Sequence, residues 1–104
     1  MRLAYHKVVK TDEYEIIAEV AEGELFLHLN VYKWGKSVLI SIRNSVSAII
    51  KQAYELGLDM VFCYIKPEKM KLVNLIRPLD DTEPMNDKFI LGIWDTNRAE
   101  DGYI

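Results

Sequence analysis

Two runs of alternating hydrophobic and polar residues lie near the N-terminus, at positions 13–20 and 25–34. The dipeptide Glu22-Gly23 separates them, and a glycine suits the positive φ of a two-residue hairpin turn. With this turn, four apolar pairs face each other: Val20 with Leu25, Ala18 with Leu27, Ile16 with Leu29, and Tyr14 with Val31. The pattern therefore predicts an antiparallel hairpin with one continuous hydrophobic face.

The opposite face of this predicted hairpin is acidic and aromatic. Seven of its side chains are candidates for contact with a partner: Glu13, Glu15, Glu19, Phe26, His28, Tyr32 and Trp34. Large aromatic residues beside charged ones are typical of interaction surfaces, and the carboxylates favour a protein partner with a basic surface. The alternative is a solvated sheet face whose aromatic residues are covered by a terminal segment.

The hydrophobic pattern then changes to spacings of three and four residues between Leu39 and Leu56. This period predicts a long amphipathic helix with Ser37 as its N-cap and Gly57 just after its end. Residues 60–65 are apolar on both faces, which predicts a central strand parallel to the second hairpin strand.

Three further segments complete the predicted elements. A proline at position 67 favours a helix over residues 68–77, residues 80–87 are a polar loop, and residues 89–94 form a last strand. The predicted order is β-β-α-β-α-β in one α+β (α/β-like) domain with a mixed sheet, spanning residues 1–104. Within residues 1–11, the stretch 3–9 fits either one more strand or a short helix, and residues 95–104 are expected to form a flexible tail.

Composition and charge narrow the function classes. The 104 residues include 13 basic and 16 acidic ones, a formal net charge of −3, which argues against direct binding to nucleic acid. The single cysteine, Cys63, excludes an internal disulfide and, with only two histidines, argues against a metal site. Its apolar strand predicts a buried, inert thiol. No apolar run approaches the ~20 residues of a membrane span, so we expect a cytoplasmic protein without membrane contact.

Two places could carry chemistry. His28 is a candidate general base, and Glu15 a candidate for proton abstraction, although a strand histidine and a surface carboxylate are more often structural. The turn containing Gly35, Lys36 and Ser37 could hold an anion at the start of the helix. It is not a phosphate loop, because Asn30 occupies the position where such a loop needs its first glycine. The simpler interpretation is an ordinary strand-to-helix turn.

The order of these elements resembles the C-terminal core of the GNAT superfamily of N-acetyltransferases, and in particular the short GNAT-like proteins of tailed bacteriophages. The likeness spans residues 12–94 and is carried mainly by residues 25–76. It implies an acetyltransferase-like core with a reduced N-terminal part, and a location in the host cytoplasm or the virion. It also implies acetyl-CoA at Gly35, Lys36 and Ser37, where the family carries an Arg/Gln-x-x-Gly-x-Gly/Ala signature. Here this turn has one glycine, and Val73 occupies the place of the family's proton-donating tyrosine.

These departures favour a non-catalytic protein on a degenerate acetyltransferase-like fold, an inhibitor or accessory protein that needs no cofactor. A partner with a basic surface would bind the acidic and aromatic face, and a homodimer is compatible with the same surface. The alternative is a divergent acetyl-CoA-dependent N-acyltransferase, with Glu15 or His28 near the acceptor amine. A third hypothesis is a small-anion-binding domain that uses only the helix N-terminus.

Overall fold

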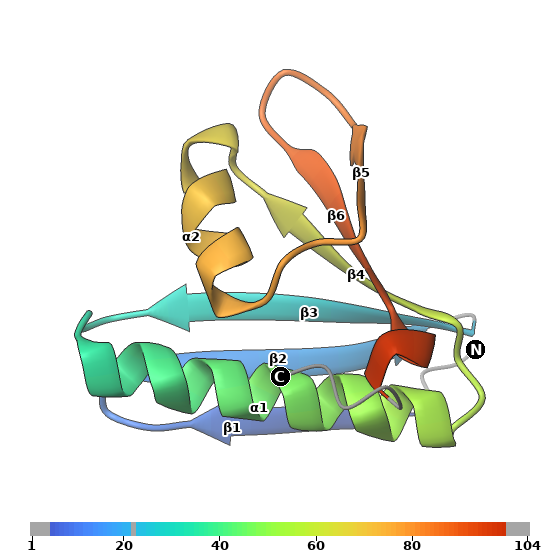
Figure 1. The fold of residues 1–104 in the computed structure, drawn as a ribbon, viewed down its shortest axis with the longest axis horizontal. Coiled ribbons are helices and arrows are strands. Elements are labelled where there is room, and N and C mark those ends of the chain that lie inside the picture. Colours follow the sequence, from blue (N-terminus) through green and yellow to red (C-terminus); the bar gives the residue numbers. More distant parts are fainter. Residues whose placement is uncertain (1–4, 22, 100–104) are drawn as a thin grey trace.

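A mixed sheet of six strands organises the chain, in a computed structural model that describes residues 5–21 and 23–99 (Figure 1). The elements follow in the order β1 (Tyr5–Lys10), β2 (Tyr14–Ala21), β3 (Glu24–Val31), α1 (Lys36–Glu55), β4 (Met60–Ile65), η1 (Pro67–Lys69), α2 (Met70–Ile76), β5 (Asp81–Pro84), β6 (Ile90–Asp95) and η2 (Thr96–Ala99). The strand order across the sheet is β1-β2-β3-β4-β6-β5. The predicted mixed sheet of class α+β is confirmed.

The β2–β3 hairpin has the register that the sequence predicts. Val20 lies opposite Leu25, and the pairing continues to Tyr14 opposite Val31. Gly23 has a φ of 80°, which a glycine adopts without strain. Strand β4 pairs parallel with β3, as the predicted strand–helix–strand unit requires.

Helix α1 follows the predicted stripe, but its N-terminus is capped differently. Gly35 is the N-cap residue and Ser37 already lies inside the helix, so the expectation that Ser37 caps the helix is wrong. At the other end Gly57 has a φ of 84°, as expected of a residue that follows a helix. The buried side chains of α1 recur every three or four residues: Val38, Ile42, Val46, Ile49, Ile50 and Ala53.

Both α-helices pack against the same face of the sheet (Figure 1). The hydroxyl of Tyr14, on β2, lies 2.6 Å from the Ser41 hydroxyl of α1. Arg43 of α1 donates hydrogen bonds to the carbonyl oxygens of Leu75 and Ile76 in α2, at 2.9 and 3.2 Å. The core therefore lies between this face and the helices, and no helix of the described residues covers the opposite face.

The C-terminal third differs from the prediction in two respects. Residues 80–87 are not entirely loop, because β5 forms within them and pairs antiparallel with β6. Every residue of β5 is exposed, so the strand leaves no hydrophobic period in the sequence. The predicted helix over 68–77 is divided into the 3-10 turn η1 and the shorter helix α2.

Both terminal segments contribute regular structure. Residues Tyr5–Lys10 form a strand that pairs with β2, and residues 1–4 lie outside the described part of the chain. Thr96, within the segment expected to be a flexible tail, is 1% exposed. Its hydroxyl donates to the carbonyl oxygens of Leu58 and Asp59, at 2.6 and 3.0 Å. This part of the expected tail is thus packed on the domain, and residues 100–104 lie outside the described part.

Candidate functional site

The sheet face that no described helix covers is the first candidate site, and we call it the open face. Strand alternation and register place these residues on it: Glu15, Ile17, Glu19, Phe26, His28, Asn30, Phe62, Tyr64, Asp81, Glu83, Leu91 and Ile93. A row of rings crosses its centre. The ring centroids of Phe26 lie 5.5 Å from Phe62 and 5.8 Å from Tyr64, and Phe89 lies 6.4 Å from Tyr64. Such spacings are those of favourable aromatic pairs.

Four of the predicted partner-binding residues lie together on the open face. Glu15, Glu19, Phe26 and His28 come from adjacent positions on β2 and β3. Nε2 of His28 lies 3.8 Å from Oε1 of Glu19, and about half of each side chain is exposed. This separation exceeds the hydrogen-bond reach of a general base, and both groups are hydrated. The pair therefore fits a surface contact better than a catalytic dyad.

Tyr32 joins this surface through Glu15, although it follows the end of β3. Its hydroxyl donates a hydrogen bond of 3.2 Å to Oε1 of Glu15. The pKa of Tyr32 is raised by partial desolvation, and further by the hydrogen bond to Glu15 and the negative charge of that carboxylate. The tyrosine therefore stays protonated at neutral pH and acts as a hydrogen-bond donor.

Glu13 and Trp34 do not share this arrangement. Glu13 is exposed just before β2, where its carbonyl oxygen accepts hydrogen bonds from the backbone of Tyr32 and Lys33. Trp34 lines a cavity on the other side of β3. The sequence prediction extends the alternation of the second strand to position 34, but β3 ends at Val31. Beyond that residue a period of two no longer assigns side chains to faces.

The sequence prediction does not identify the other half of the aromatic row. Phe62 and Tyr64 alternate along β4 with the buried Val61, Cys63 and Ile65. Residues 60–65 are apolar at every position except Tyr64, so the pattern predicts a strand buried on both faces. The aromatic residues Phe62 and Tyr64 are two positions apart, so they share one face of β4. This spacing is the feature of the sequence that indicates the open face, because parallel pairing with β3 places Phe62 beside Phe26.

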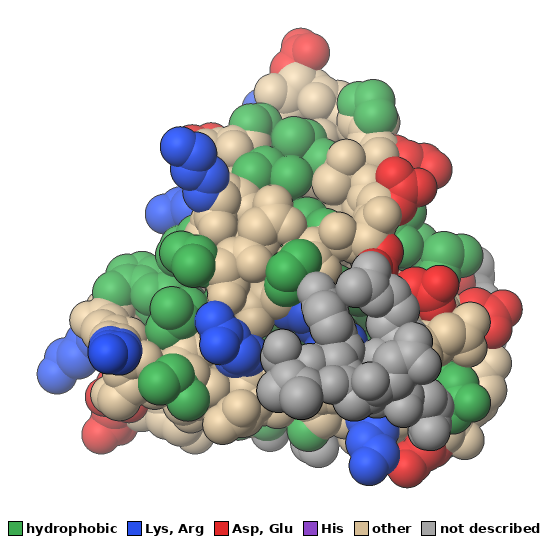
Figure 2. Space-filling model, viewed as in Figure 1, with side chains coloured by type: hydrophobic (Ala, Val, Ile, Leu, Met, Phe, Trp, Pro, Cys, Tyr) green, Lys and Arg blue, Asp and Glu red, His purple; other side chains and the backbone are tan. Residues whose placement is uncertain are grey.

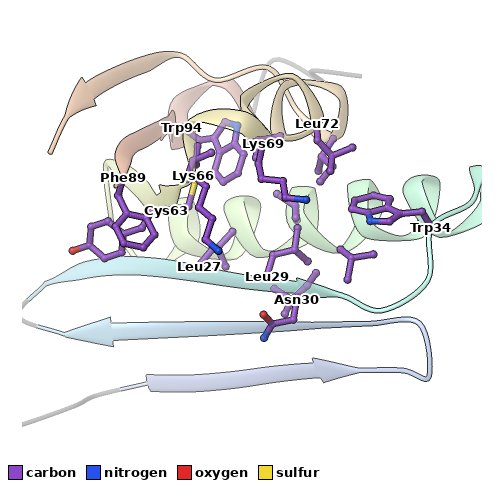
Figure 3. Close-up of a pocket in the computed structure, with 17 residues that line it drawn as sticks. Leu27, Leu29, Asn30, Trp34, Cys63, Lys66, Lys69, Leu72, Phe89 and Trp94 are labelled. Carbon is purple, nitrogen blue, oxygen red and sulfur yellow. The ribbon is translucent and has the colours of Figure 1, made fainter. Parts of the chain in front are cut away.

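A cavity between β3 and β4 is the second candidate site (Figure 3). The two parallel strands pair only from Leu25 to Leu27, opposite Val61 to Cys63, and then diverge. The backbone N–H of Tyr32 donates to the carbonyl oxygen of Glu13, just before β2, so by alternation the backbone groups of Leu29 and Val31 face the gap. The cavity has a volume of about 360 Å³. That size lies within the range of roughly 300–1,000 Å³ typical of ligand pockets.

The interior of this cavity is apolar, and its charged groups lie at the edge. Its interior is mostly aliphatic, and Lys66 and Lys69 lie at its edge. Cys63 also lines it, and burial raises the pKa of that thiol to about 12. Because the thiolate is the nucleophile, Cys63 is unreactive at neutral pH, in agreement with the predicted inert thiol.

The predicted cofactor-binding and catalytic residues are not brought together. Gly35, Lys36 and Ser37 are exposed at the start of α1, and none of them lines the cavity. His28 and Glu15 belong to the open face and do not line the cavity either. Neither His28 nor Glu15 would thus lie beside an acyl donor in the cavity to act as its general base.

Residues 5–21 and 23–99 contain no group of three or more His, Cys, Asp or Glu side chains that could hold a metal ion. Within the same residues, no helix is long and apolar enough to span a membrane. Comparisons of the chain with protein-family models, with curated proteins and with solved structures found no match. The candidate sites of this chain are therefore the open face and the cavity.

Proposed function

We propose that this chain is a non-catalytic protein-binding module whose open face docks a partner protein with a basic surface. One observation carries the proposal: an aromatic row (Phe26, Phe62, Tyr64 and Phe89) crosses a sheet face that no described helix covers. The resemblance to short phage-encoded acetyltransferase-like proteins suggests the role of an inhibitor or accessory protein. The domain would supply a rigid surface rather than a reaction.

The aromatic row has the make-up of a binding hot spot. Phe26 and Phe62 are half-buried and Tyr64 is 47% exposed, so the rings are held in place by the sheet but remain accessible. Rigid aromatic side chains contribute large contact area at low cost in conformational entropy. A partner that covers the row would remove this area from water, which is the main source of affinity at a protein interface.

Charge selects the kind of partner. Glu15 and Glu19 border the row on the β2 side, and Asp81 and Glu83 border it on the β5 side. Lys10 pairs with Glu15 and is exposed, and Nε2 of His28 lies 3.8 Å from Oε1 of Glu19. Carboxylates on both margins favour lysine and arginine in the partner, and they speed association more than they strengthen the complex.

Affinity capture on the immobilised chain, followed by titration of the purified partner, tests the proposal. We expect Tyr64→Ala to weaken binding at least tenfold, because it removes the exposed ring at the centre of the row. Glu19→Lys should slow association and reduce its dependence on salt. Circular dichroism would verify that both variants fold.

A matched control is Leu75→Ala, which removes another exposed hydrophobic side chain. Leu75 is 55% exposed on α2, on the helix-covered side that Figure 2 shows, where hydrophobic side chains are interspersed with Lys and Arg. The control should bind the partner like the wild type. A partner that responds to Leu75→Ala and not to Tyr64→Ala would overturn the proposal. So would a complex consisting only of two copies of this chain.

The second candidate function is a divergent acetyl-CoA-dependent N-acyltransferase. The divergence of β3 and β4 supports it, since an acyl donor could lie in the gap beside the start of α1. Isothermal titration with acetyl-CoA separates the two proposals, and we expect no binding at micromolar concentrations. Micromolar binding that is lost in Gly35→Val would favour the transferase and contradict a purely protein-binding role.

A further inference from the structure

We propose that the cavity between β3 and β4 binds a small aliphatic carboxylate, with its hydrocarbon tail inside the cavity and its head group at Lys66 and Lys69. The inference does not rest on the docking function, because it needs no protein partner, although Tyr64 and Phe89 of the aromatic row also line the cavity. The proposed ligand also differs from a coenzyme A thioester, because the carboxyl group of the acyl chain is bonded to sulfur in the thioester and carries no negative charge.

The interior of the cavity favours a hydrocarbon chain. Leu27 and Leu29 line it from β3, Val46 from α1, and Val73 and Ile76 from α2. Its volume of about 360 Å³ equals that of roughly twelve liquid water molecules. Water gains few hydrogen bonds among such side chains, whereas an alkyl chain gains both burial and dispersion contacts.

The cavity exists because of the sheet's geometry. Strand β4 stops pairing with β3 after Cys63, while α1 and α2 cover the helix side of the gap. The side chains of β3 and β4 beyond Cys63 are therefore too far apart to pack against each other across the gap. An apolar cavity of this kind forfeits contacts when empty, and it gains them when a ligand of similar shape enters.

The polar groups at the edge favour an anionic head. In Figure 3 the side chains of Lys66 and Lys69 extend from the α2 side toward β3, over the gap. Among the described residues, the ion pair within 4 Å joins His28 and Glu19. Neither lysine ammonium group therefore has a carboxylate oxygen of the described residues within that distance. The lysines have no carboxylate partner in this part of the chain, and they lie beside an aliphatic interior. This arrangement is complementary to a ligand with one negatively charged end and an apolar tail.

The cavity is expected to bind this ligand rather than react with it. Cys63 supplies a thiol to the lining, and burial raises its pKa to about 12. Its neutral thiol does not attack a carboxylate at physiological pH. The inferred role is thus reversible binding, without a covalent step.

Isothermal titration with decanoate, kept below its micelle concentration at pH 7, tests the site in the intact chain. We expect one molecule to bind per chain. Butanoate should bind at least a hundredfold more weakly, because each buried methylene contributes about a threefold to fourfold gain. Decylamine, which has the same tail and the opposite charge, should bind at least tenfold more weakly than decanoate.

Substitutions in and outside the lining distinguish binding at this site from non-specific hydrophobic binding. The double variant Lys66→Gln, Lys69→Gln should weaken decanoate binding about tenfold, while Lys71→Gln, on an exposed lysine of α2 outside the lining, should not. Val73→Trp should abolish binding by filling the cavity, and circular dichroism would show whether it folds. The lysine variants alter exposed side chains only, so they keep the test decisive if Val73→Trp fails to fold.

Three results would overturn the inference. The wild type could fail to bind decanoate, or could bind decylamine as tightly as decanoate. The double lysine variant could also retain full affinity. Tight binding of acetyl-CoA without binding of decanoate would count against the aliphatic carboxylate and in favour of the transferase.

Discussion

Replacing Trp94 with alanine is expected to lower the free energy of unfolding by about 3–5 kcal/mol. Trp94 on β6 is 3% exposed and belongs to the core cluster between sheet and helices. Its indole N–H also donates a buried 3.0 Å hydrogen bond to the carbonyl oxygen of Arg77, just after α2. The substitution would thus create a large cavity and leave a buried acceptor without its donor.

Urea denaturation followed by circular dichroism measures this loss. Domains of this size have stabilities of about 5–15 kcal/mol, so Trp94→Ala should shift the midpoint strongly or leave the chain unfolded. Trp34→Ala is the matched control, because Trp34 is 47% exposed and precedes α1. We expect the control to lose less than about 1 kcal/mol. Equal losses in the two variants would show that Trp94 does not anchor β6 to α2.

The N-terminal half of the fold could be predicted because its hydrophobic pattern has only one consistent register. A slip of one residue in the β2–β3 hairpin would turn Ile16 and Leu27 toward solvent, so the register follows from the sequence. The stripe of α1 is equally informative, since Ile42, Val46 and Ile49 recur at helical spacing. By contrast, β5 is held by backbone pairing to β6 and has no buried side chain. Such an edge strand has no pattern to detect.

The candidate sites were only partly predictable for a related reason. Glu15, Glu19, Phe26 and His28 share the open face because they lie within regular strands, where alternation assigns a side. Trp34 lies past the end of β3, and no periodicity there indicates that it lines the cavity. The cavity itself results from the point where β3 and β4 separate. That point depends on the twist of the sheet and on how the helices pack, and neither property is local in sequence.

Gly92→Val is the second substitution with a large expected effect, a loss of about 2–3 kcal/mol in the free energy of unfolding. Gly92 is buried on β6 and faces the core side of the sheet, opposite Cys63. A Cβ atom there would lie 2.5 Å from Cδ1 of Ile65, 2.9 Å from Cδ2 of Leu79 and 3.1 Å from Sγ of Cys63. One added carbon already requires these side chains to move, and the two further methyl groups of valine require the strand to shift.

Thermal and urea unfolding of Gly92→Val, Gly92→Ala and Gly35→Ala would measure the effect. Gly92→Ala should cost less than valine, because Ile65 and Leu79 can move the ends of their side chains away from one Cβ. A Cβ atom added at Gly35 would have nothing within 4 Å, and the φ of 177° there is extended, so Gly35→Ala should cost no more than about 1 kcal/mol, the amount by which alanine is the poorer N-cap residue. The two glycines thus separate a steric requirement from a general effect of losing glycine. A neutral Gly92→Val would mean that β6 can move away from β4 without loss, and would contradict the tight packing beside the cavity.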